Sequence, residues 1–125
     1  GMFGKKWGRI GDAPVIGAGT YADNESVAIS CTGHGEYFIR HSVAFNVSAR
    51  YKFLGESLEE AADHVIFEEL NREEGNGGLV AVDRHGNIAM PFNCSGMYRG
   101  YLYKEKGTGR IVEAYGINHN LIEKQ

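Results

Sequence analysis

A short loop near the start of the sequence carries a cation and a carboxylate at a spacing that suits one small ligand. Arg9 and Asp12 lie three residues apart and are bracketed by Gly8 and Gly11. A guanidinium forks onto a carboxylate, and a carboxylate accepts hydrogen bonds from an ammonium group. The pair is therefore a candidate clamp for both ends of an α-amino acid. The residues themselves leave one alternative open, an internal salt bridge between Arg9 and Asp12 within a turn.

A second stretch, residues 30–36, joins a predicted strand to a predicted helix and contains Thr32, Gly33 and Gly35. A turn of this kind exposes backbone N–H groups at the start of a helix, where they stabilise a developing oxyanion. The Thr32 hydroxyl can add a further donor. The local pattern alone favours a plain tight turn with Thr32 packed beneath it, so the oxyanion role is a hypothesis at this point.

Two other patterns are weaker indications of a ligand. Residues 17–22 fit the G-x-G-x-x-A spacing of a dinucleotide loop, but the residues after them lead to another strand and not to the helix that such a loop requires. Cys31 and His34 have a metal-like spacing, whereas zinc needs three or four converging ligands. We therefore expect no nucleotide, no metal and no other cofactor.

The elements that must position these residues follow from the hydrophobic pattern. Residues 14–16 and 26–31 are predicted strands, the second because Val27, Ile29 and Cys31 alternate with small or polar residues. The strand at 26–31 leads directly into the stretch that contains Thr32.

A pair of helices is predicted next. Four-residue spacing of Ile39, Val43 and Val47 predicts a helix over residues 36–53. The sequence Ser57-Leu58-Glu59-Glu60 is a capping box that begins a second helix, which runs to about residue 73.

The rest of the chain contains a hairpin and a tail. Residues 79–82 and 88–90 are predicted strands joined by a turn over 83–87. The tail, residues 93–125, is expected to be irregular, with a possible short strand near 110–114.

Composition limits the partners. The 125 residues include 13 Lys plus Arg against 16 Asp plus Glu, and 42% are hydrophobic, which predicts one globular domain over residues 1–125. A net charge of −3 disfavours nucleic acid. The apolar runs are far shorter than a membrane span, and two cysteines are too few for a disulfide scaffold. We expect a cytoplasmic protein.

The order strand, strand, helix, helix, strand, strand predicts an α+β fold in which a helix pair covers one face of a sheet. One layer of helices leaves the opposite face open. We expect a partner chain or a second copy of this chain to cover that face.

Several segments together resemble the plant-type asparaginase and isoaspartyl peptidase family. They are residues 8–24, 31–36, 77–83, 90–93 and 95–99. The resemblance extends in order and spacing across almost the whole chain, which makes it far more specific than any single motif.

The resemblance implies an N-terminal-nucleophile (Ntn) hydrolase, a four-layer αββα sandwich whose precursor cuts itself into α and β subunits, with this chain as most of the β-subunit half. It implies that Arg9 holds the substrate α-carboxylate and Asp12 the α-amino group, with backbone contacts from Gly33 and Gly35. Thr32 and the Gly33 N–H would form the oxyanion hole. The α subunit would cover the open sheet face, in a heterotetramer made of two αβ units.

In this family the β subunit begins with a Thr whose hydroxyl attacks the amide and whose free α-amino group is the base. Residue 1 here is Gly, so we expect the nucleophilic Thr to lie outside these 125 residues. We predict that the intact protein hydrolyses L-asparagine and β-aspartyl dipeptides through a β-aspartyl-enzyme ester. The alternatives are a catalytically silent chain that retains aspartate binding, and an amidohydrolase similar to aspartylglucosaminidase. The segment 97–99 favours the peptidase over the latter.

Overall fold

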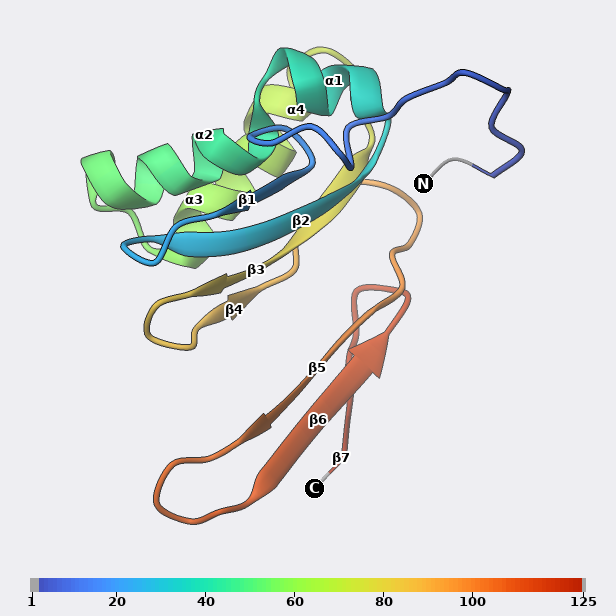
Figure 1. Cartoon of the computed structure of the whole chain (residues 1–125). Coiled ribbons are helices and arrows are strands. Elements are labelled where there is room, and N and C mark those ends of the chain that lie inside the picture. Colours follow the sequence, from blue (N-terminus) through green and yellow to red (C-terminus); the bar gives the residue numbers. More distant parts are fainter. Residues whose placement is uncertain (1–2, 125) are drawn as a thin grey trace. The chain divides into compact units, whose positions relative to one another are not determined.

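The computed structural model describes residues 3–124 and contains two compact units, Gly1–Asn93 and Cys94–Gln125. Each unit has a sheet of its own, and helices and strands are mixed as the predicted α+β class requires (Figure 1). The assignment of residues 1–125 to one domain stays a prediction.

The sheet of the first unit is antiparallel and has the order β1-β2-β3-β4. Its two long strands pair over seven positions, from Val27 opposite Asp83 to Gly33 opposite Gly77. The strands are β1 (Thr20–Ala22), β2 (Val27–Gly33), β3 (Gly77–Asp83) and β4 (Ile88–Ala89). The predicted hairpin is confirmed as β3 and β4, and the strand predicted at 26–31 is confirmed as β2, shifted by one or two residues.

The strand predicted at residues 14–16 is wrong. These residues form turns, because the N–H of Val15 donates to the Asp12 carbonyl and the N–H groups of Ala18 and Gly19 donate to the Val15 carbonyl. The first strand of the unit is instead β1, which follows the turns. Apolar side chains at residues 14–16 gave a strand-like pattern, but Ile16 is 82% exposed and packs into no core.

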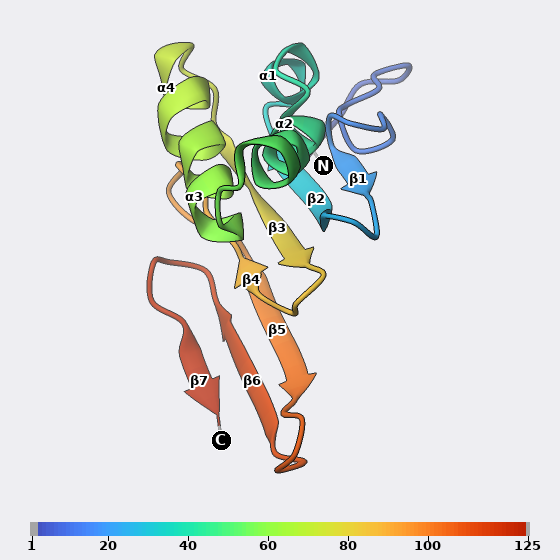
Figure 2. The same ribbon diagram turned by 90° about the vertical axis from the view of Figure 1, so that its left-hand side faces the viewer.

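Two helical segments, residues 35–54 and 58–72, lie side by side in one layer on one face of this sheet (Figure 2). The helix predicted over residues 36–53 is interrupted, because Ser42 adopts a left-handed conformation with φ 47°. The second helix begins with the predicted capping box, which is confirmed at Ser57 and Glu60. The helical elements are α1 (Gly35–Arg40), α2 (Val43–Ala49), the π-helical η1 (Arg50–Leu54), α3 (Leu58–Asp63), the π-helical η2 (His64–Glu69) and α4 (Leu70–Arg72).

The core lies between the helices and the sheet. The alternation predicted for β2 is confirmed, because Val27, Ile29 and Cys31 are all buried. The predicted apolar stripe of the second helix is also confirmed. Its buried members are Ala62, Val65, Ile66 and Leu70.

The opposite face of the sheet carries no helix of this unit (Figure 1). Its outward side chains are small or apolar and are exposed, with Val80 at 38%, Val82 at 42% and Ile88 at 38%. The side chain of Thr32 lies on this open face as well, because residues along β2 alternate and Cys31 is buried while Thr32 is exposed. The open face that the sequence predicted is therefore present in this unit.

The second unit is more regular than predicted. The short strand predicted near residues 110–114 is confirmed as β6, but the rest of the tail is not irregular, because β6 pairs in an antiparallel sheet with both β5 and β7. Ala114 and Met97 are its buried apolar residues. The strands at 99–104 and 122–124 were not predicted, because their residues gave too weak an alternation of apolar and polar side chains. The strands are β5 (Arg99–Lys104), β6 (Ile111–Gly116) and β7 (Ile122–Lys124). Of the helices formed by residues 3–124, none combines the length and apolar character that crossing a membrane requires.

Candidate functional site

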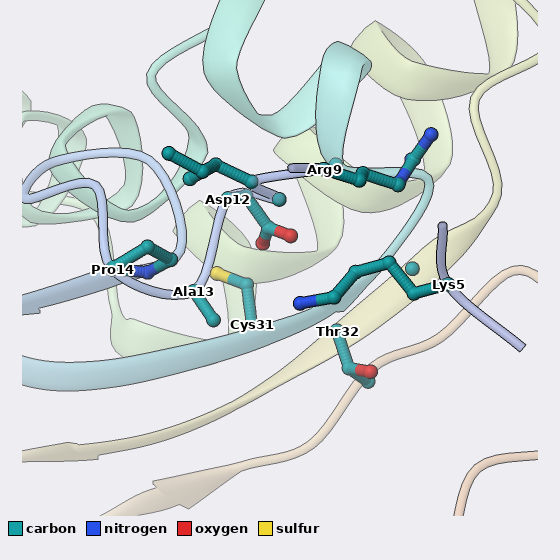
Figure 3. A pocket seen from close by; sticks show the side chains of 11 residues that line it. Lys5, Arg9, Asp12, Ala13, Pro14, Cys31 and Thr32 are labelled. Carbon is teal, nitrogen blue, oxygen red and sulfur yellow. The ribbon is translucent and has the colours of Figure 1, made fainter. Parts of the chain in front are cut away.

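A cavity of about 210 Å³ lies in the first unit where the N-terminal loop passes over the end of β2 (Figure 3). It gathers every residue that the sequence analysis nominated for substrate contact, from segments more than twenty positions apart. The residues that line it are Lys5, Arg9, Ile10, Gly11, Asp12, Ala13, Pro14, Cys31, Thr32, Gly33 and Gly35.

Asp12 is the most unusual group in the cavity. Its side chain is only 6% exposed, and its Oδ2 atom is buried without a hydrogen-bond partner among residues 3–124. Burial raises the pKa of this carboxyl, and the negative charge of Glu36 raises it further, against the lowering effect of a hydrogen bond from its own backbone. A buried carboxylate oxygen without a donor costs free energy in the empty protein. It is the arrangement expected of a group whose partner arrives with a ligand.

Two glycines allow Asp12 to be buried. A Cβ at Gly35, the first residue of α1, would lie 2.9 Å from both the backbone N and the Oδ1 of Asp12. A Cβ at Gly19 would lie 2.3 Å from the Asp12 carbonyl oxygen. The loop therefore packs directly onto the backbone of two other segments, and side chains at either position would displace it.

Arg9 is arranged differently from Asp12. Its side chain is 35% exposed and its Nη2 atom lies 3.4 Å from Oε2 of Glu36, at the start of α1. The internal Arg9–Asp12 salt bridge that the sequence left open is not formed, because the guanidinium pairs with Glu36 instead. This contact is long and exposed, so the guanidinium can still receive a carboxylate.

Cys31 adds a thiol to the cavity wall but not a nucleophile. Burial, together with the negative charge of Asp12, raises the pKa of Cys31 to about 12. The thiolate is the reactive form of cysteine, and at neutral pH this side chain is a thiol.

Thr32 and Gly33 lie in a different element from the one predicted. Both are the last residues of β2 and not part of a turn, and only His34 separates the strand from α1. The strand extends this far because Thr32 pairs with Gly78 and Gly33 pairs with Gly77. In Figure 3 the Thr32 side chain points away from the Asp12 side of the strand. A group that meets the Thr32 hydroxyl therefore approaches from the open face of the sheet.

Gly33 is held where only glycine fits. Its φ is +144°, and a Cβ there would lie 2.3 Å from the Asn76 carbonyl oxygen. The side chain of Asn93 fastens this neighbouring loop, with Oδ1 accepting from the Gly77 N–H at 2.8 Å and Nδ2 donating to the Gly75 carbonyl at 2.8 Å. Sequence reasoning did not single out Asn93 as a positioning residue, since nothing in the pattern shows that residue 93 returns to residues 75–77.

Lys5 is the other residue that sequence reasoning missed. It stands beside Lys6 in the sequence and lines the cavity with Arg9 and Asp12. Among the described residues, His, Cys, Asp and Glu side chains form no cluster suited to a metal ion.

Comparison with known proteins identifies the family of the chain. The sequence profile of the asparaginase family matches residues 1–112. The isoaspartyl peptidase of Escherichia coli strain K12 is 50% identical over 117 residues, which cover 86% of this chain and 36% of that protein. The isoaspartyl peptidase of Salmonella typhimurium is 52% identical over 103 residues, covering 82% and 33%. A probable isoaspartyl peptidase/L-asparaginase of Arabidopsis thaliana is 49% identical over 100 residues, covering 80% and 30%.

These relatives are named as isoaspartyl peptidases or L-asparaginases, and the chain belongs to the asparaginase family. The chain spans about a third of the length of the curated relatives it matches.

Proposed function

We propose that the whole protein hydrolyses L-asparagine and β-aspartyl dipeptides. The observation that carries this proposal is the buried Oδ2 of Asp12, which has no hydrogen-bond partner within the described range 3–124 and lies in the same small cavity as Arg9. An α-ammonium group on Asp12 would supply the missing donors, and an α-carboxylate would fork onto the guanidinium of Arg9. The names of the relatives, isoaspartyl peptidase and L-asparaginase, support the same substrate class.

The reaction needs a site for the oxyanion as well as a clamp. In the proposed mechanism the hydroxyl of Thr32 and the backbone N–H of Gly33 receive the substrate carbonyl oxygen as it becomes negative. Gly33 and Gly35 add backbone contacts to the bound aspartyl group. Both Thr32 and the two glycines line the same cavity as the clamp, which supports this division of roles.

The nucleophile in this proposal is a Thr from outside these 125 residues. Its hydroxyl oxygen bonds to the amide carbon while its free α-amino group takes the proton, and the C–N bond then breaks as that proton passes to the leaving amine. Water hydrolyses the resulting β-aspartyl ester and restores the hydroxyl. In this proposal the attack takes place at the open face of the first unit's sheet, and the exposure of Thr32 on that face supports it.

The same open face supports the proposed assembly. Exposed Val80, Val82 and Ile88 form an apolar surface suited to a second sheet. We propose that the α subunit of the same precursor supplies that sheet, which would complete the αββα sandwich of an Ntn hydrolase. Two such αβ units would form the heterotetramer.

One observation favours a second candidate function. Cys31 is held as a thiol, and Thr32 has no free amine to serve as a built-in base, so neither supplies a nucleophile in the cavity. A chain without an added nucleophile would bind aspartate and not turn it over.

The test combines an assay with a mass measurement. Release of aspartate is measured from a β-aspartyl dipeptide and from a glycosylated asparagine, and native mass spectrometry asks whether a polypeptide with an N-terminal Thr travels with this chain. Dipeptide hydrolysis with such a partner supports the proposal. Preference for the glycosylated substrate would indicate an activity similar to aspartylglucosaminidase. Aspartate binding without turnover would leave the silent alternative.

A further inference from the structure

Lys5 brings a second cation into the candidate site, and its placement bears on which substrates the site prefers. Figure 3 shows its side chain extending into the cavity from the N-terminal loop, on the side where Cys31 and Asp12 also point. The neighbouring Lys6 does not line the cavity. The two lysines therefore differ in position although they are adjacent in the sequence.

The proposed clamp gives both charged ends of an amino acid a partner but does not use Lys5. Arg9 pairs with Glu36 in the empty protein, and the α-ammonium group of the proposed ligand pairs with Asp12. Lys5 forms no ion pair with any residue in the range 3–124. When an amino acid's own ammonium and carboxylate occupy Asp12 and Arg9, the ammonium group of Lys5 lies at the cavity without a direct partner.

We infer that Lys5 is a specificity-determining residue that favours ligands with a second carboxylate. This inference rests on the proposed function. Such a carboxylate has two sources in that reaction: the C-terminal carboxylate of a β-aspartyl dipeptide, and the side-chain carboxylate of the aspartate product. L-Asparagine has neither, so Lys5 should favour dipeptides over the free amide and should strengthen inhibition by aspartate.

The size of the effect is limited by solvent. Lys5 is exposed, and an exposed charge pair is weakened by water and by salt. Loss of the ammonium should therefore change selectivity by about twofold to fivefold at low ionic strength. High salt should remove most of that difference.

The experiment compares Lys5→Met with Lys5→Arg and with the matched control Lys6→Met, all in the whole protein. The first readout is the ratio of kcat/KM for β-aspartyl-leucine to kcat/KM for β-aspartyl-leucinamide, which differ only in the second carboxylate. The second readout is the ratio of the inhibition constant of L-aspartate to the KM of L-asparagine. Each is measured at 20 mM and 500 mM NaCl.

If Lys5→Met lowers the kcat/KM ratio of the two leucine substrates, Lys5 contacts the carboxylate of the leaving group. If Lys5→Met raises the ratio of the aspartate inhibition constant to the asparagine KM, Lys5 contacts the side-chain carboxylate of the product. Lys5→Arg should keep most of the selectivity, and Lys6→Met should leave both ratios as in the wild type. Unchanged ratios in Lys5→Met, or equal changes in Lys6→Met, would overturn the inference while leaving the hydrolase proposal standing.

If the wild-type protein hydrolyses none of these substrates, the proposed function fails separately. The inference is then tested by calorimetric binding of L-aspartate against L-asparagine. Lys5→Met should reduce the preference for aspartate by the same factor of about two to five, and an unchanged preference would overturn the inference.

Discussion

Replacing Asp12 with Asn should make the protein more stable and abolish its function as an amino-acid clamp. The carboxylate is almost fully buried and one of its oxygens has no partner among residues 3–124. An amide of the same shape removes the buried negative charge and its repulsion from Glu36. The amide still needs hydrogen bonds of its own, so the substitution removes only part of the cost of an unsatisfied buried group. We expect the free energy of unfolding to rise by about 1 kcal/mol. For a chain of this size that corresponds to a rise in Tm of about 3–6 °C.

The pH dependence of the stability difference shows whether Asp12→Asn stabilises the protein by removing a buried charge or by better packing. The pKa of Asp12 is raised in the folded state, so between the unfolded value of 3.8 and the folded value the native protein binds more protons than the unfolded chain. The wild type must therefore lose stability as pH rises through that window and keep the penalty above it. The advantage of Asp12→Asn should be full at pH 7.5 and should shrink as pH falls toward 4.

The assay is thermal unfolding followed by circular dichroism at pH 7.5 and pH 4.5, together with calorimetric titration of L-aspartate. Asp23→Asn is the matched control with the opposite sign. The pKa of Asp23 is lowered by a hydrogen bond from the Glu25 N–H and by Lys52, so its contribution is present above pH 3.8 and lost as pH falls. That variant should be less stable than the wild type at pH 7.5. A destabilised Asp12→Asn protein at pH 7.5, or one that binds aspartate as the wild type does, would refute the reasoning.

Three further variants test other parts of the site and the fold. Arg9→Ala should weaken aspartate binding about tenfold to a hundredfold in calorimetry, because a forked charged contact is worth about 1.5–3 kcal/mol. Its Tm should barely move, since the ion pair that it loses is exposed, and a large drop in Tm would mean that the residue is structural. Gly35→Ala should lower Tm strongly because its Cβ meets backbone, whereas Gly11→Ala has open space at the same cavity and should unfold like the wild type. Equal thermal shifts in those two variants would contradict the packing described. Ser57→Ala should cost about 1 kcal/mol in urea unfolding by removing the hydrogen bond to the Glu60 N–H, and an unchanged midpoint would show that the capping box is not stabilising.

Elements with strong periodicity were predictable from the sequence. The buried alternation in β2 and the buried stripe of the second helix were confirmed because one face of each element packs into the core and the other faces out. The capping box at Ser57 is a local device that needs no tertiary context, and it was confirmed as well.

The errors have physical causes. A break in the first helix at Ser42 depends on carbonyls of a distant loop, because the N–H groups of Ala44 and Phe45 donate to Ala18 and Gly17. That interaction cannot be read from the helix's own pattern. In the same way, the turns at residues 14–16 satisfy their own backbone locally and override an apolar run that looked like a strand.

The candidate site was predictable as a set of residues but not as a geometry. Spacing nominated Arg9 and Asp12 together, yet only the fold shows that Glu36 pairs with the guanidinium and that Oδ2 of Asp12 has no hydrogen-bond partner among residues 3–124. The sequence likewise did not predict that Lys5 lies at the cavity, because nothing in the local pattern distinguishes it from the adjacent Lys6.

The central claim is that Arg9 and Asp12 hold the two ends of one aspartyl group, and a crystal structure of the whole protein with L-aspartate tests it most directly. We predict the α-ammonium group within hydrogen-bond distance of Asp12 Oδ2 and the α-carboxylate on the guanidinium of Arg9, with the side-chain carboxylate directed toward Thr32 and Gly33. L-Aspartate bound elsewhere, or bound in this cavity with its ammonium group away from Asp12, would contradict the account.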